Sequence, residues 1–144
     1  VLKIENIEEC KYTPYKVTFI NKLGAYQDLW FFKRSTLSMT KKEEMFKSNI
    51  INNGSYNTYQ HQYETFHVNA KEKLSLNTGF YPESYNEVFR QMSLSDKIWI
   101  EYNEKTLPVR LTSSDLSFKT RLNDKLINYT IELEFAFDKI NNVR

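Results

Sequence analysis

LINYTIELEFAF, residues 126–137, is the stretch of sequence that decides the fold. From residue 129 to residue 137 every second side chain is large and apolar. Successive side chains of a β-strand point to opposite faces, so this row faces one way, toward a core. Glu132 and Glu134 alternate with the row, and we expect them on a solvated face. The stretch therefore predicts a half-buried β-strand.

The residues just before this stretch alternate in the same way. Apolar and polar side chains take turns over residues 116–122. If Leu122 pairs with Ile127 across a four-residue loop, Phe118 lies opposite Ile131 and both apolar rows share one face. The end of the chain therefore predicts a long final hairpin.

A second hairpin is predicted near the start of the chain. Tyr15–Ile20 alternates, 21–24 supplies turn residues, and Tyr26 to Phe32 reads as a returning strand. That strand ends in four consecutive apolar residues, one of them Trp30. Both of its faces must therefore be covered, one by the core and one by another element or a partner.

The middle of the chain gives weaker signals. Residues 35–62 follow neither a helical nor a strand period, which predicts a long loop that is functional, ordered on a neighbouring molecule, or simple surface slack. Residues 63–68 and 74–78 then predict a hairpin around the turn 69–72.

One amphipathic helix follows, over Pro82 to Leu94. Pro82 can occupy the first turn, and four apolar residues recur at helical spacing: Tyr85, Val88, Phe89 and Met92. Two further strands are predicted at 97–102 and 107–111, where Pro108 indicates a strand start or a sheet edge.

Composition agrees with a β-rich fold. The 144 residues include ten Tyr, ten Phe and two Trp but three Gly and three Pro, a mix that suits strands. We expect residues 1–144 to form one mainly β domain, a β-sandwich or barrel of eight or so strands with one flanking α-helix. The first residue, Val1 rather than Met, leaves room for a longer parent protein.

No constellation of residues predicts an enzyme. Cys10 is the single cysteine, which excludes an internal disulfide, and His61 and His67 lack the further ligands of a zinc site. The chain contains no nucleophile elbow and too few glycines for a phosphate-binding loop. We expect no catalytic residues, no metal and no cofactor. A net charge of +2 does not favour direct nucleic-acid binding, and no apolar run is long enough to cross a membrane.

Exposed aromatic residues are the remaining candidates for an interaction site. Tyr56 and Tyr59, with Asn57 between them, lie in the predicted loop, and Trp30 ends a strand. Such rings stack on sugars, so one candidate function is a carbohydrate-binding or receptor-binding module. The alternative is a structural domain that assembles with other proteins.

The order of elements resembles virion structural proteins of tailed bacteriophages. The resemblance is carried by 76–80, 83–88, 97–101, 107–109 and the ending 122–138. This order of helix, strand, Pro-Val strand and long final hairpin is similar to the tail-tube and distal-tail type. The resemblance covers about half of the chain.

The resemblance implies a β-sandwich or barrel that assembles into rings by extending sheets between neighbours. It further implies a homo-oligomer with other tail proteins as partners, assembled in the host cytoplasm and located in the virion.

Overall fold

A computed structural model of the protein describes residues 8, 11–51, 53–112 and 126–139. Within them, seven antiparallel strands form one sheet in the order β2-β1-β6-β7-β9-β4-β3, and β5 pairs with β8. The strands are β1 (Tyr15–Ile20), β2 (Tyr26–Phe31), β3 (Ser35–Lys47), β4 (Tyr63–Asn77), β5 (Tyr81–Pro82), β6 (Ile98–Tyr102), β7 (Lys105–Leu111), β8 (Leu126–Ile127) and β9 (Thr130–Phe135). A 3-10 turn, Glu83–Tyr85, leads into the helix α1, Asn86–Ser93.

The hairpin of β1 and β2 forms as predicted. Asn21 starts its turn, where the side-chain oxygen accepts hydrogen bonds from the backbone of Leu23 and Ala25. Gly24 has a φ of 78°, a conformation that favours glycine. Two alternate residues of each strand are buried in the core: Val17 and Phe19 in β1, Leu29 and Phe31 in β2.

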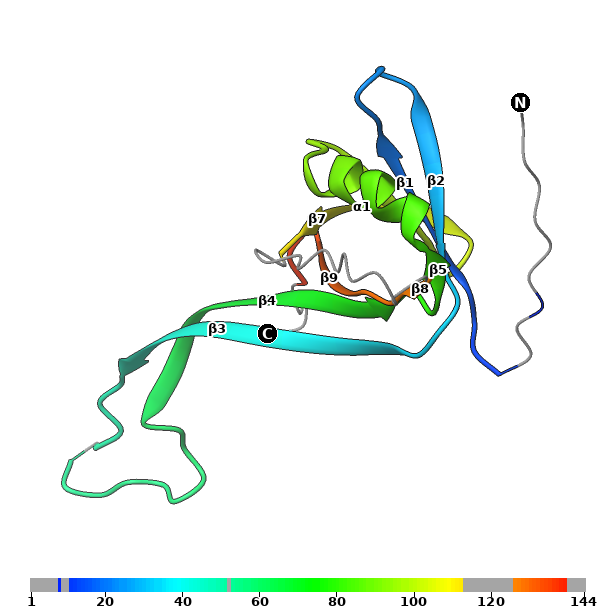
Figure 1. The fold of residues 1–144 in the computed structure, drawn as a ribbon. Helices are drawn as coiled ribbons and strands as arrows, with labels where there is room; N and C mark the ends of the chain where they lie inside the picture. The colour runs from blue at the N-terminus through cyan, green and yellow to red at the C-terminus, as the bar shows by residue number, and fades with distance from the viewer. Residues whose placement is uncertain (1–7, 9–10, 52, 113–125, 140–144) are drawn as a thin grey trace.

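The helix is also confirmed, and it covers one face of the curved sheet (Figure 1). Its Phe89 and Met92 are fully buried among side chains from the sheet. Phe89 makes edge-on ring contacts with Tyr81 and Tyr129, which join the helix to the small sheet and to the start of β9. Such contacts add to the free energy gained by burial.

The predicted fold class is confirmed: the described protein is mainly β, with one helix packed on the sheet. Among the described strands β2 and β3 end the sheet without pairing to each other, so the arrangement is sandwich-like rather than a closed barrel. In β9 the predicted row is buried through Phe135, whereas Phe137 is half-exposed. Residues 116–122, the predicted partner strand, lie outside the described residues.

The long loop predicted at 35–62 is wrong for its first half. Residues 35–47 form β3, a thirteen-residue strand paired with β4 throughout. Twelve of those residues are exposed, so neither face selects apolar side chains and the period of two is lost. The described residues of the connection, 48–51 and 53–62, do lie outside regular structure, apart from a single bridge residue at Ser55.

The hairpin predicted around 69–72 is wrong as well. Those residues lie inside β4, which runs unbroken for fifteen residues. The polar run Asn69-Ala70-Lys71-Glu72 reads as a turn, but Asn69 pairs with Lys42 and Ala70 with Lys41. Three of these four side chains are at least partly in contact with water, so a polar run can occur here without a turn.

Two smaller expectations also fail. Pro108 lies within β7, an interior strand, rather than at a strand start or a sheet edge. Its carbonyl oxygen accepts a hydrogen bond from the backbone N–H of Ala136. The register with β9 begins only at Val109, so the N–H that proline lacks would lie beyond the end of that pairing. Glu134 was expected in solvent, yet it is buried with 7% exposure because basic side chains cover it.

Candidate assembly surface

A long hairpin of β3 and β4 projects from the rest of the protein (Figure 1). β9 pairs with β4 only over Lys73–Asn77, and one bridge follows, between Ala70 and Lys139. We call residues 41–69 the arm. Over the described residues the two strands of the arm pair only with each other. A two-stranded ribbon with water on both faces gains little from burial.

The outer edge of β3 is the longest open strand edge in the described part of the chain. Its first six residues, 35–40, carry no charge. The next four are two lysines followed by two glutamates. Leu37 pairs with the core residue Leu74, so Leu37 and Met39 lie on the core face of the sheet. They remain 48% and 63% exposed because no strand lies beyond β3.

The tip of the arm carries three of the four predicted interaction residues. Ser48 donates a backbone hydrogen bond to Gln62, which closes the connection between the strands. Tyr56, Asn57 and Tyr59 are all exposed on this connection. The structure therefore brings these three to one end of the molecule.

Trp30 lies elsewhere, on β2, at the opposite end of the strand order from β3. It is half-exposed and lines a groove of about 290 Å³ beside Lys16, Glu101 and Asn103. The ammonium of Lys16 and the carboxylate of Glu101 are 2.7 Å apart, and this hydrogen bond raises the pKa of Lys16. Trp30 is thus not part of the tip.

A β-bulge near the end of the arm exposes apolar residues that the sequence analysis missed. Glu44 pairs with His67 but Met45 pairs with Thr65, so Phe66 has no partner in register. Met45, Phe46 and Phe66 are all exposed. Exposed apolar residues close together on an open ribbon are a feature of protein interfaces.

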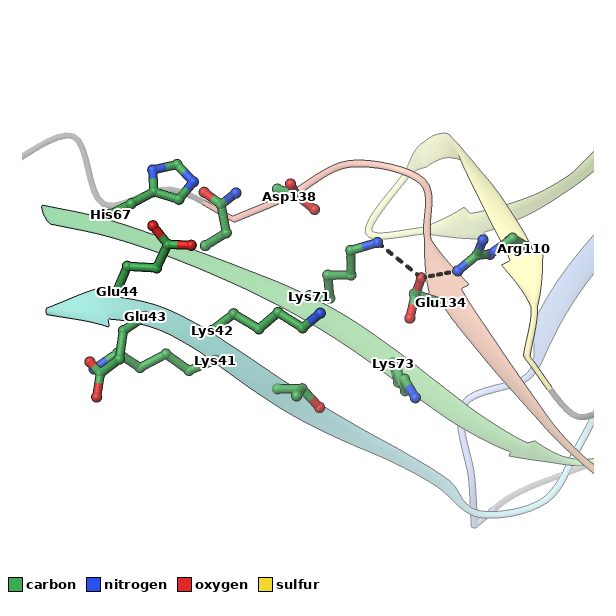
Figure 2. A pocket seen from close by; sticks show the side chains of 12 residues that line it. Lys41, Lys42, Glu43, Glu44, His67, Lys71, Lys73, Arg110, Glu134 and Asp138 are labelled. Atoms are coloured by element: carbon green, nitrogen blue, oxygen red, sulfur yellow. Dashed lines mark hydrogen bonds and ion pairs between the residues drawn. The ribbon is translucent and has the colours of Figure 1, made fainter.

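A charged groove of about 840 Å³ lies where the arm meets the sheet (Figure 2). No sequence pattern pointed to it, because its residues come from four separate segments. It is lined by Thr40, Lys41, Lys42, Glu43, Glu44, His67, Asn69, Lys71, Lys73, Arg110, Glu134 and Asp138. The lining mixes both signs of charge, which does not select a simple anion or cation.

Glu134 is the buried group of this groove. Its Oε1 accepts a hydrogen bond of 2.7 Å from Arg110 on β7 and one of 3.4 Å from Lys71 on β4 (Figure 2). Burial alone would raise the pKa of the carboxyl, but the two cations outweigh it and hold the pKa of Glu134 below its ordinary value. Glu134 is therefore an ionised group that links three strands.

Within the described residues no group of three or more His, Cys, Asp or Glu side chains is placed to hold a metal ion. His61 and His67 are exposed. Cys10 lies outside the described residues. None of the helices in the described part has the length and apolar character needed to cross a membrane.

Comparisons with known proteins find similarity among solved structures. No family model and no curated protein matches the chain. Among solved structures, the chain is similar to a chain in the 6-fold symmetrised cryo-EM structure of the anti-feeding prophage (AFP) baseplate. The two chains share 20% sequence identity with a TM-score of 0.42, and the match covers 96% of each.

Proposed function

We propose that the protein is a non-enzymatic assembly module of a phage tail or a related tail-like particle. The structural observation that supports this function is the open edge of β3 over residues 35–40. Unpaired backbone groups there can pair with a strand of a neighbouring subunit, and an added strand would cover Leu37 and Met39. The resemblance of element order to virion structural proteins points in the same direction.

Other copies of this chain and other tail proteins are the partners we propose. A homo-oligomer follows naturally, because each copy offers the same open edge and the same arm. The tip residues Tyr56, Asn57 and Tyr59 would contact a neighbour beyond the reach of the sheet. The proposed location is the virion, after assembly in the host cytoplasm.

A pair of charges on the open edge tests the role of β3. Leu37→Lys with Met39→Lys should leave a folded protein, since both side chains are exposed, but should block strand addition. Leu23→Lys, in the exposed turn between β1 and β2, is the matched control. Sedimentation over a wide concentration range should show association for the unaltered protein and the control.

The edge variant should sediment as a monomer at every concentration. A pull-down from particle lysate should likewise recover tail proteins with the control and not with the variant. If the double variant associates and recovers partners as the control does, addition along β3 is not the mode of assembly.

Removing the tip tests the arm separately. Deletion of residues 49–58 leaves both strands of the arm and should leave a folded protein. We expect this form to lose association, because it lacks the tyrosines that reach a neighbour. Association equal to that of the full-length protein would refute the role of the tip.

Glycan or receptor binding is the second candidate function. The groove beside Trp30 favours it, since an exposed ring next to the Lys16–Glu101 pair offers both stacking and hydrogen bonds. A glycan array should then give signals that Trp30→Ala removes, or that Tyr56→Ala with Tyr59→Ala removes if the tip is the site. A blank array for the unaltered protein would end this alternative.

A further inference from the structure

The root of the arm is held to the sheet by few contacts. Beyond the β4–β9 pairing, Ala70 and Lys139 exchange two backbone hydrogen bonds, of 3.1 and 2.7 Å. Lys139 also pairs with Glu72 at 3.5 Å, where both side chains are partly in water. Exposed pairs of this kind contribute little to stability. The Ala70–Lys139 hydrogen bonds and the Lys139–Glu72 pair alone would therefore fix the direction of the arm only weakly, and a further contact is needed.

Glu134 lies next to this root and touches both sides of it. Arg110 and Lys73 are its direct partners across the sheet, on β7 and β4 respectively. Lys71, two residues closer to the arm, turns its ammonium toward the same carboxylate oxygen that Arg110 contacts (Figure 2). One buried charge thus connects the body of the sheet to the first residues beyond the β4–β9 pairing.

Burial makes these contacts matter more than the surface pairs nearby. A carboxylate that is 7% exposed has lost most of its hydration, so its protein partners must replace that hydration. If the arm swings away and opens the Ala70–Lys139 bridge, the adjoining Lys71 moves with it, and Glu134 keeps only the contact with Arg110. The position of the arm and the number of cations that contact the Glu134 carboxylate are therefore coupled.

We propose that Glu134 is a positioning residue: its charge fixes the direction of the arm relative to the sheet, and its protonation releases the arm. The coupling itself needs no assembly partner. Its consequence, that acid should weaken assembly by loosening the arm before the sheet unfolds, rests on the proposed function.

The charged surroundings of Glu134 define how pH acts. In the described residues it is faced by Arg110 from β7, by Lys71 and Lys73 from β4, and by Asp138 from the segment after β9. The same groove is also lined by the charged or titratable side chains of Lys41, Lys42, Glu43 and Glu44 from β3 and of His67 from β4. Arg110, Lys71 and Lys73 stay charged throughout the acid range, so a change there belongs to another titratable group of the groove. Replacing Glu134 separates its titration from that of Asp138.

Hydrogen exchange at single amides tests the proposal. Glu134→Gln keeps the shape of the side chain and removes its charge, and Glu132→Gln makes the same change at an exposed position of the same strand and face. At neutral pH the amides of Ala70 and Lys139 should exchange about tenfold faster in Glu134→Gln than in the control. The amide of Ile100, in the middle of the sheet, should be unchanged.

A second variant and a pH series complete the test. Lys71→Gln should loosen the same amides while leaving the Arg110 contact in place. After correction for intrinsic exchange, acid should accelerate both amides in the unaltered protein but not in Glu134→Gln. If Glu134→Gln exchanges like Glu132→Gln, or keeps the full pH response, the positioning role is wrong. A positive result with no assembly at any pH would support the positioning role and refute the proposed function.

Discussion

Phe135→Ala tests the central claim about the core. Phe135 is 3% exposed at the end of β9. Its ring packs edge-on against the ring of Tyr102, with the two ring centres 5.6 Å apart. Deleting a buried aromatic ring removes its transfer free energy and leaves a cavity, which together cost about 3–5 kcal/mol. Phe137→Ala is the matched control, because this side chain is 39% exposed and its ring packs on that of Phe135, with the ring centres 5.7 Å apart.

Urea unfolding followed by tryptophan fluorescence measures the difference. We expect the midpoint for Phe135→Ala to fall well below that for Phe137→Ala, with the denaturant slope unchanged. The control should lose about half as much stability or less, since much of its ring already contacts water. Equal losses for the two variants would refute the assignment of Phe135 to the core.

Three other outcomes follow from the structure. Because the folded protein lowers the pKa of Glu134, its ionised carboxylate stabilises the fold fully above the ordinary carboxyl value of about 4.3, and this contribution disappears as pH falls through the lowered pKa. At pH 6 the free energy of unfolding should therefore be larger for the unaltered protein than for Glu134→Gln. This difference should shrink in acid. Thr78→Val should cost about 1–3 kcal/mol, since the buried hydroxyl accepts a hydrogen bond from the backbone of Tyr129 at 3.0 Å, and calorimetry measures this. Elemental analysis should find no stoichiometric zinc, and assays should find no turnover of glycosides or esters; about one metal per chain would contradict the expectation.

Sequence patterns predicted those elements that bury one face. In β1, β2 and β9 the alternation of side chains follows from a core on one side and water on the other, and α1 shows the helical equivalent. These elements and the mainly β fold could therefore be read directly. Tyr56, Asn57 and Tyr59 were expected in a loop because residues 35–62 follow neither period, and these three do lie on an exposed connection.

The arm could not be predicted, for a physical reason. Both of its faces meet water, so its side chains show no alternation between an apolar and a polar face, and the polar run 69–72 at its root imitates a turn. Glu134 was missed for a different reason. Its burial depends on Arg110 and Lys71, which are 24 and 63 residues away in sequence and meet it only through strand order.

The arm also shows why a strand can form without a pattern. Thirteen residue pairs, interrupted by one bulge, hold β3 to β4, yet Met45, Phe46 and the bulge residue Phe66 stay in contact with water. Backbone pairing alone stabilises a two-stranded ribbon only marginally. A ribbon of this length is therefore expected to gain its remaining stability from surface that it buries elsewhere. A neighbouring subunit would supply that surface, and Glu134 would hold the arm in the direction from which the neighbour is met.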